Sequence, residues 1–113
     1  MIQKIEIFSG YWVFVTDSVK KINKQLLRIE PDTSLEVLVD NHNPPNGRAF
    51  WVDSEKGYFL AMYLRKPISR KTVIHESVHI ISYLMGYLDI HDEEFKAVAT
   101  AYLSEKILKD FNV

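Results

Sequence analysis

The spacing of apolar and polar residues predicts an alternation of strands and helices along the chain. Apolar residues alternate with polar ones between residues 2 and 8, and a second β-rich run covers residues 11–15. Between residues 19 and 29 the apolar positions recur every three or four residues, which predicts an amphipathic helix that ends before Pro31. Further strands are predicted at residues 35–39, 49–52 and 58–64. The last two form a predicted hairpin, because their connection contains Gly57.

Two longer helices are predicted in the last third of the chain. The first begins near Arg70, after the capping residue Ser69, and ends at Gly86. The second has Asp89 as its cap and runs to about Asp110. Its expected apolar side includes Phe95, Val98 and Tyr102. We therefore expect an α+β fold of one domain, residues 1–113, with N-terminal strands and a helix, a short and mostly antiparallel sheet, and two C-terminal helices.

The first of these two helices carries the pattern H-E-x-x-H at residues 75–79. Residues four apart lie on the same face of a helix, so His75 and His79 can direct two imidazole nitrogens at one point. Two such nitrogens make up half of a tetrahedral zinc site. Glu76 lies about 100° round the helix from His75, close enough to hold a metal-bound water without being a ligand. The pattern therefore predicts a metal-dependent hydrolase.

Composition narrows the choice of partners and ligands. The 113 residues carry a formal net charge of -1, so nucleic acid is not an expected partner. Cysteine is absent, which leaves His, Asp and Glu as the side chains able to hold zinc. The chain shows neither a signal-peptide pattern nor an apolar stretch long enough to cross a bilayer. We therefore expect a cytoplasmic protein that does not associate with a membrane.

A hydrolytic zinc site needs a third protein ligand besides the two histidines, with the fourth position open to water. Because the turn between the last two helices is short, the final helix should return beside the first and bring its first turns near His79. His91 and Glu94 are three residues apart and share a helical face, so both are candidates.

The two neighbouring glutamates of the final helix differ in their expected surroundings. Glu94 shares its side with Val98 and Ala101, so we expect it to turn toward packed surface, where a carboxylate needs a cation or hydrogen-bond donors. Glu93 is in line with Ala97 and is expected to face solvent. The pattern therefore favours Glu94 as the third ligand.

These motifs resemble those of the zincin metallopeptidases, and particularly the minimal gluzincin-like domains, which include small ones encoded by bacteriophages. In those domains the third ligand is a Glu in an E-x-x-A context on the helix after the motif, and Glu94 and Ala97 match it. SprT-like proteases are a second choice, because they carry a third His in an H-[GD]-x-x-F context that His91 and Phe95 match. The resemblance covers the layout of residues 10–108, and specific residues match in the last two helices.

The resemblance implies a zinc-dependent metallopeptidase with one Zn2+ per chain, a peptide or protein substrate, and Glu76 as the general base. It also implies that the strand at residues 58–64 is a sheet edge along which an extended peptide lies, with Leu60 and Met62 as substrate-binding residues. Two other functions stay open. One is a catalytically inactive zincin-like module that binds a protein partner, and the other is a metal-dependent hydrolase of a small amide.

Overall fold

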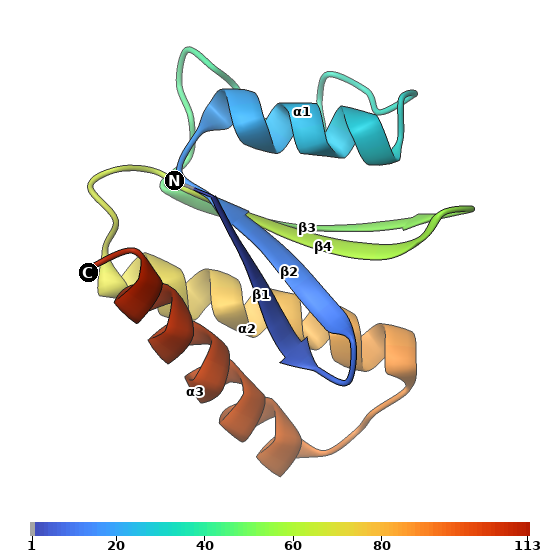
Figure 1. Cartoon of the computed structure of the whole chain (residues 1–113), viewed down its shortest axis with the longest axis vertical. Coiled ribbons are helices and arrows are strands. Elements are labelled where there is room, and N and C mark those ends of the chain that lie inside the picture. Colours follow the sequence, from blue (N-terminus) through green and yellow to red (C-terminus); the bar gives the residue numbers. More distant parts are fainter. Residues whose placement is uncertain (1) are drawn as a thin grey trace.

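The computed structural model describes residues 2–113, which form four strands and three helices (Figure 1). The strands are β1 (Ile2–Phe8), β2 (Tyr11–Thr16), β3 (Gly47–Ser54) and β4 (Gly57–Leu64). The helices are α1 (Val19–Ile29), α2 (Arg70–Leu88) and α3 (Glu93–Asp110). The predicted α+β class is confirmed.

All four strands belong to one mixed sheet in the order β1-β2-β4-β3. β1 and β2 form an antiparallel hairpin, whose tight turn places Ser9 and Gly10 at φ values of 47° and 83°. β3 and β4 form a second antiparallel hairpin. The two hairpins are joined by parallel pairing of β2 with β4, in which Val13 pairs with Leu60 and Thr16 with Tyr63. The edges of the sheet are therefore β1 and β3.

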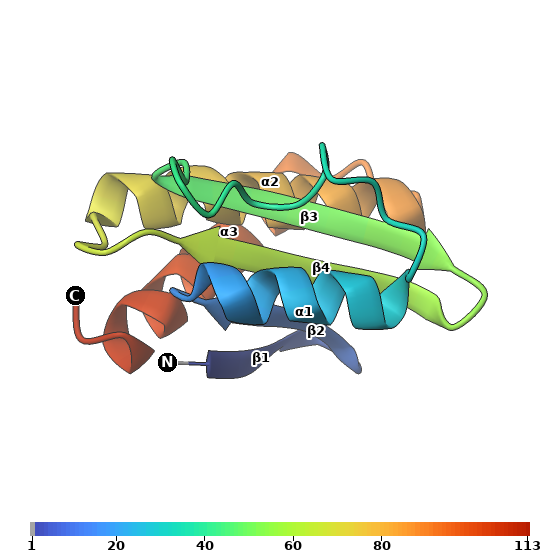
Figure 2. The same ribbon diagram turned by 90° about the horizontal axis from the view of Figure 1, so that it is seen from above.

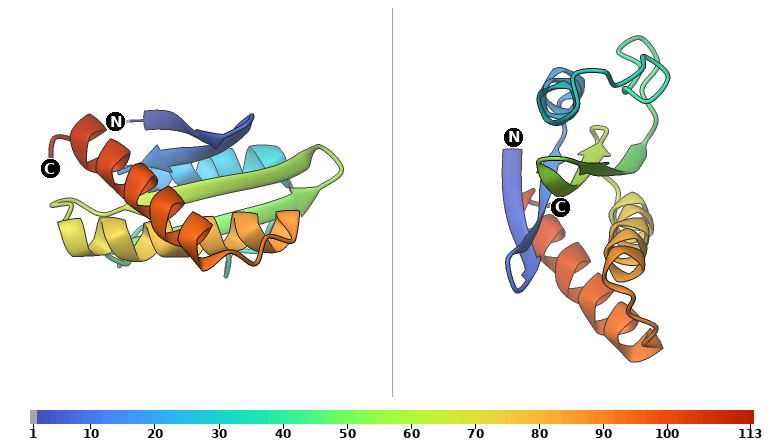
Figure 3. Two further views of the ribbon diagram at one scale, coloured as in Figure 1. Left: turned by 90° about the horizontal axis from the view of Figure 1, so that it is seen from below. Right: turned by 90° about the vertical axis from the view of Figure 1, so that its right-hand side faces the viewer.

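The helices cover the two faces of the sheet unequally (Figures 1 and 2). α1 lies on one face, where Ile22 and Leu26 pack with Phe50 of β3 and Tyr63 of β4. α2 and α3 lie on the other face and bury the larger core, with α2 against β3 and β4 and α3 against β1. The end-on view in Figure 3 shows α1 and α2 on opposite sides of β3 and β4. None of the helices within residues 2–113 combines the length and hydrophobicity that a membrane crossing requires.

The segment between α1 and β3 differs from the prediction, because residues 35–39 form a turn and not a strand. The backbone of Val39 bonds to α1 instead of to a neighbouring strand. Asn23 accepts from the Val39 N–H at 2.8 Å and donates its amide N–H to the Val39 carbonyl at 2.9 Å. One side chain thereby holds the connection against the helix.

The junction between α2 and α3 also differs. α2 continues past Gly86 to Leu88, since Leu88 still packs against the core, and it ends at Asp89 in the left-handed conformation with φ 56°. Asp92, and not Asp89, caps α3 by accepting a hydrogen bond from the backbone N–H of Glu94 at 2.9 Å. The connection between the two helices therefore lies at residues 89–92, further along the chain than the sequence predicts, and is no shorter.

Candidate metal centre

The H-E-x-x-H residues lie in the middle of α2, a helix held by its cap and by the core. Ser69 caps its N-terminus by accepting from the backbone N–H of Thr72 at 3.1 Å. The core side of the helix is formed by Val73, Ile80, Ile81 and Leu84, all fully buried. The opposite side is exposed and carries both histidines. Packing of one side thus sets the direction in which the other side presents its side chains.

His75 and His79 approach each other on the exposed side of α2. Their Nε2 atoms are 3.2 Å apart, and their ring planes are inclined by 79°. Two nitrogen ligands of one tetrahedral zinc, each about 2.05 Å from the metal, are separated by about 3.3 Å. The pair therefore has the spacing of two zinc ligands with no movement of the helix. The same distance also suits a hydrogen bond between the rings, in which one ring donates from Nε2.

Glu76 lies beside the histidine pair and is buried, with 7% of its surface exposed. Its Oε2 atom is 3.9 Å from the Nε2 atom of His75. The side chain is covered by Gly47, the first residue of β3, which passes very close to α2. A Cβ atom added to Gly47 would lie 3.0 Å from Glu76 Cγ and 2.5 Å from the methyl carbon of Thr72. The absence of a side chain at Gly47 therefore lets β3 confine the Glu76 carboxylate.

A cavity of about 370 Å³ opens beside these residues. Its lining combines the chain before β3 with the first turns of α2: Asn46, Gly47, Ser69, Lys71, Thr72, His75 and Glu76. The H-E-x-x-H pattern did not predict that Asn46, Gly47 or Lys71 would lie beside these residues. The only sequence signal for Gly47 is a glycine that follows a cluster of turn-forming residues, and such a cluster predicts a turn and not a close approach between two elements.

The exposed side of α2 is tied to β3 by a group of aromatic rings. Tyr83, one turn after His79, has its ring 6.2 Å from the imidazole in a stacked arrangement, and it also contacts Trp51 of β3. Tyr58 stacks on Trp51 and donates from its hydroxyl to the Tyr83 carbonyl at 3.0 Å. Burial, together with the charge of Asp53, raises the pKa of Tyr58 to about 12. These contacts fix the position of the edge strand relative to the histidines.

Both candidates for the third ligand lie outside this group. His91 is in the connection before α3, where its Nε2 atom is 2.7 Å from Asp89 Oδ1, and both side chains are exposed. Glu94 is in the first turn of α3 and is also exposed. Within residues 2–113, no three side chains of His, Cys, Asp or Glu are placed together as a group that could hold a metal. The structure thus brings the three motif residues together and does not bring Glu94 or His91 to them.

α3 turns a different side toward the rest of the protein than the sequence predicts. Val98 and Tyr102, expected on its apolar side, are 62% and 50% exposed. Phe95 packs edge-on against Phe8 of β1, with ring centroids 5.3 Å apart. Glu93 is exposed, as expected, and lies at the cleft between α2 and α3. The expectation that Glu94 turns toward packed surface was wrong, because Glu94 is exposed as well. The buried side of α3 comprises Leu103, Ser104, Ile107 and Leu108.

The strand predicted as a peptide-binding edge lies inside the sheet. β4 pairs with β3 along its whole length and with β2 from Leu60 to Tyr63, so it is an internal strand. Leu60 and Met62 are 5% and 0% exposed and belong to the core beneath the sheet. The prediction of β4 as the edge was wrong, because nothing in its sequence showed the parallel pairing with β2. The sheet edge beside the histidines is β3.

Comparisons of the chain with protein-family models, with curated proteins and with solved structures find no significant match.

Proposed function

We propose that this protein is a zinc-dependent metallopeptidase with a zincin-like fold. The observation that carries the proposal is the 3.2 Å separation of the His75 and His79 Nε2 atoms on an exposed helix face. A buried carboxylate, Glu76, adjoins them and has the position that a general base requires. The donor set suits zinc, since imidazole nitrogens are among its preferred ligands.

The third ligand in this proposal is Glu94, with His91 as the alternative. Both side chains are exposed, so neither is held by packing and either can change rotamer. Glu93 enters the comparison because it lines the cleft between α2 and α3. All three residues belong to the start of α3 or to the connection before it.

Bound zinc would polarise the scissile carbonyl and acidify the attacking water. Glu76 accepts the proton of that water at Oε2 and then delivers it to the leaving amine. The close approach of Gly47 keeps the carboxylate beside His75, so little reorganisation is needed during the reaction. In this mechanism Glu76 therefore transfers the proton, and the two histidines are ligands of the zinc.

The substrate lies along β3 in this proposal. An edge strand presents free backbone N–H and C=O groups that can pair with an extended peptide. β3 begins at Gly47 beside Glu76, and its Trp51 contacts the Tyr83 ring that stacks on His79. A peptide paired with β3 would therefore run past the histidine pair. The cavity that Lys71 helps to line would accept one of its side chains.

Metal analysis of the purified protein tests the proposal first. We expect about one zinc per chain at neutral pH, lost on dialysis against a chelator and strongly reduced in His75→Ala and His79→Ala. Glu76→Gln should retain zinc and lose peptide cleavage, because the amide cannot accept the proton. Protein that binds no zinc, with folding verified by circular dichroism, would refute the metallopeptidase.

The zinc affinity of three matched variants identifies the third ligand. Glu94→Ala should weaken zinc binding by at least about tenfold, as expected for loss of a ligand, whereas His91→Ala and Glu93→Ala should not. A loss confined to His91→Ala would move the ligand to that residue. Zinc binding without cleavage of any peptide would favour a protein-binding module, and cleavage of small amides alone would favour the small-amide hydrolase.

A further inference from the structure

The strands β2 and β4 separate from each other at one end of the sheet. Their parallel pairing runs from Val13 and Leu60 toward the C-terminal ends of the strands. β2 begins two residues before this pairing, at Tyr11, and β4 begins three residues before it, at Gly57. The first residues of both strands therefore flank an opening between the two hairpins.

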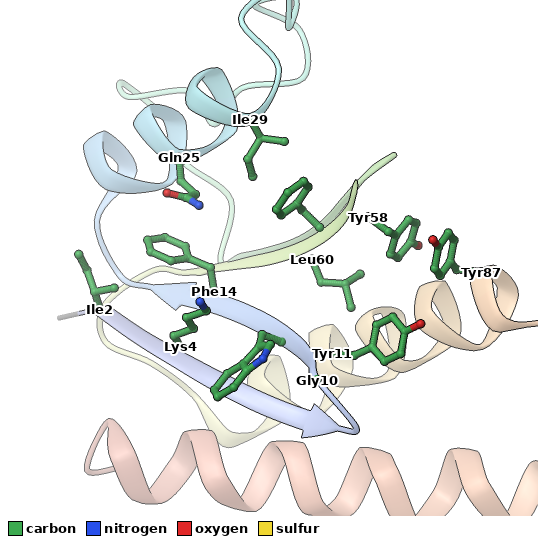
Figure 4. A pocket seen from close by; sticks show the side chains of 12 residues that line it. Ile2, Lys4, Gly10, Tyr11, Phe14, Gln25, Ile29, Tyr58, Leu60 and Tyr87 are labelled. Atoms are coloured by element: carbon green, nitrogen blue, oxygen red, sulfur yellow. The ribbon is translucent and has the colours of Figure 1, made fainter. Parts of the chain in front are cut away.

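A cavity of about 530 Å³ occupies this opening and extends under the side of α1 (Figure 4). This volume falls within the range of about 300–1,000 Å³ typical of small-molecule sites. Gln25 and Ile29 project from α1 toward the sheet and close one side of the cavity. Half of its twelve lining residues are aromatic, namely Tyr11, Trp12, Phe14, Tyr58, Phe59 and Tyr87.

One wall of the cavity is held by ring contacts. Tyr58 and Tyr87 stack with centroids 4.0 Å apart and planes inclined by 11°, and Tyr11 meets Tyr87 edge-on at 6.4 Å. The Tyr58 hydroxyl is fixed by its hydrogen bond to the Tyr83 carbonyl. These rings support one another across β2, β4 and α2, so the cavity is largely formed before any ligand enters.

The charge carried by the residues that line the cavity is positive. Of its lining residues, Lys4 alone carries a formal charge, and its Nζ atom lies 5.2 Å from the centroid of the Trp12 ring. Glu6, two residues along β1, accepts from the backbone N–H of Gly10 at 3.1 Å in the hairpin turn, and it does not line the cavity. The helix α1, which closes the cavity, carries four Lys or Arg side chains and no carboxylate. An anion is therefore favoured inside.

We propose that this cavity binds a small aromatic anion, with its ring system between the aromatic walls and its acidic group at Lys4. Flat rings fit stacked and edge-on aromatic walls, and the ammonium of Lys4 provides a charge-assisted hydrogen bond. Trp12 is 43% exposed, and a ligand in the cavity would cover part of its ring. Neither histidine of α2 lines the cavity, so binding here does not require the proposed zinc centre.

Two fluorescent probes with the same ring system test the proposal. 8-Anilinonaphthalene-1-sulfonate carries an anionic group, and N-phenyl-1-naphthylamine lacks it. With Trp51→Phe, Trp12 is the only tryptophan of the chain, so energy transfer to a bound probe reports on the cavity. We expect one sulfonate probe per chain, bound about tenfold more tightly than the neutral probe.

Three variants distinguish the contribution of the Lys4 charge to probe binding from that of the cavity walls. Lys4→Met should weaken the sulfonate probe about tenfold and change the neutral probe by less than about twofold. Lys109→Met, which removes an exposed lysine outside the cavity, should change neither. Gln25→Phe should fill the cavity from α1 and weaken both probes.

Equal affinity of Lys4→Met and the unchanged chain for the sulfonate probe would overturn the proposal, as would binding of several probes per chain. Sedimentation of the protein alone supplies a further test. A dimer in which Trp12 becomes shielded from quenchers as protein concentration rises would show that a second copy occupies the surface, and would also overturn it.

Discussion

Replacing Gly47 with alanine tests whether β3 packs as closely on α2 as the structure shows. The new Cβ atom would lie 2.5 Å from the Thr72 methyl carbon and 3.0 Å from Glu76 Cγ. Carbon atoms in contact are normally about 3.5–4.0 Å apart, so the methyl must retreat by about 1 Å. The φ angle of Gly47 lies outside the left-handed region, so the cost is steric and not conformational.

The expected change in the free energy of unfolding is the sum of two opposing effects. Overpacking a close contact lowers the free energy of unfolding by about 1–3 kcal/mol. Alanine also restricts the unfolded chain, which raises it by about 0.4–1 kcal/mol. The net expectation is a loss of about 1–2 kcal/mol. With a urea m-value of about 1.5 kcal/mol/M, the unfolding midpoint should fall by about 1 M.

A second substitution identifies the contact responsible. Thr72→Ser removes the methyl group nearest to Gly47 and keeps the hydroxyl that accepts from Ser69 Oγ at 2.9 Å. The double variant Gly47→Ala with Thr72→Ser should recover about 1 kcal/mol relative to the sum of the single variants. Gly86→Ala is the matched control, because its Cβ would meet nothing within 4 Å. It lies inside α2 and should gain about 0.5–1 kcal/mol.

Urea unfolding followed by circular dichroism measures the unchanged protein and the four variants. A midpoint for Gly47→Ala equal to or above that of the unchanged protein, at constant m-value, would refute the close packing of β3 on α2. Strict additivity in the double variant would show that the Thr72 methyl is not the obstacle.

Two further predictions concern the aromatic group and the connection after α1. Burial raises the pKa of Tyr58 from its usual value near 10 to about 12, so its contribution to stability is complete below pH 10 and is lost as pH rises toward 12. Tyr58→Phe should therefore make the fall of the urea midpoint between pH 9.5 and 11.5 shallower, and an unchanged slope would contradict the assignment. Asn23→Ala removes both hydrogen bonds to Val39 and should cost about 2 kcal/mol, with faster proteolysis within residues 30–46. Unchanged proteolysis would show that the connection is held by other contacts.

The helices were predictable because their signals are local. The capping residue Ser69 and the helical period of the apolar residues place α2 correctly at its start. The end of α2 was missed, because the choice between Gly86 and Asp89 depends on whether Leu88 has core to pack against. Because α2 continues to Leu88, the cap of α3 is Asp92 and not Asp89.

The identity of the sheet edge was not predictable from the residues of the strands. β4 is almost entirely apolar toward its end, as a central strand is, but an apolar run does not state which neighbours it pairs with. The parallel contact between Val13 and Leu60 joins segments far apart in the chain, and it alone makes β4 internal and leaves β3 as the edge.

By itself, the sequence determined the relation among His75, Glu76 and His79, because residues four apart share a face on any helix. Only the tertiary structure decided what surrounds them. The packing of Gly47 against α2 covers Glu76, and the packing of α3 leaves Glu94 exposed instead of turned toward the core. Such contacts depend on how separate elements meet, and the local pattern of apolar residues does not encode that.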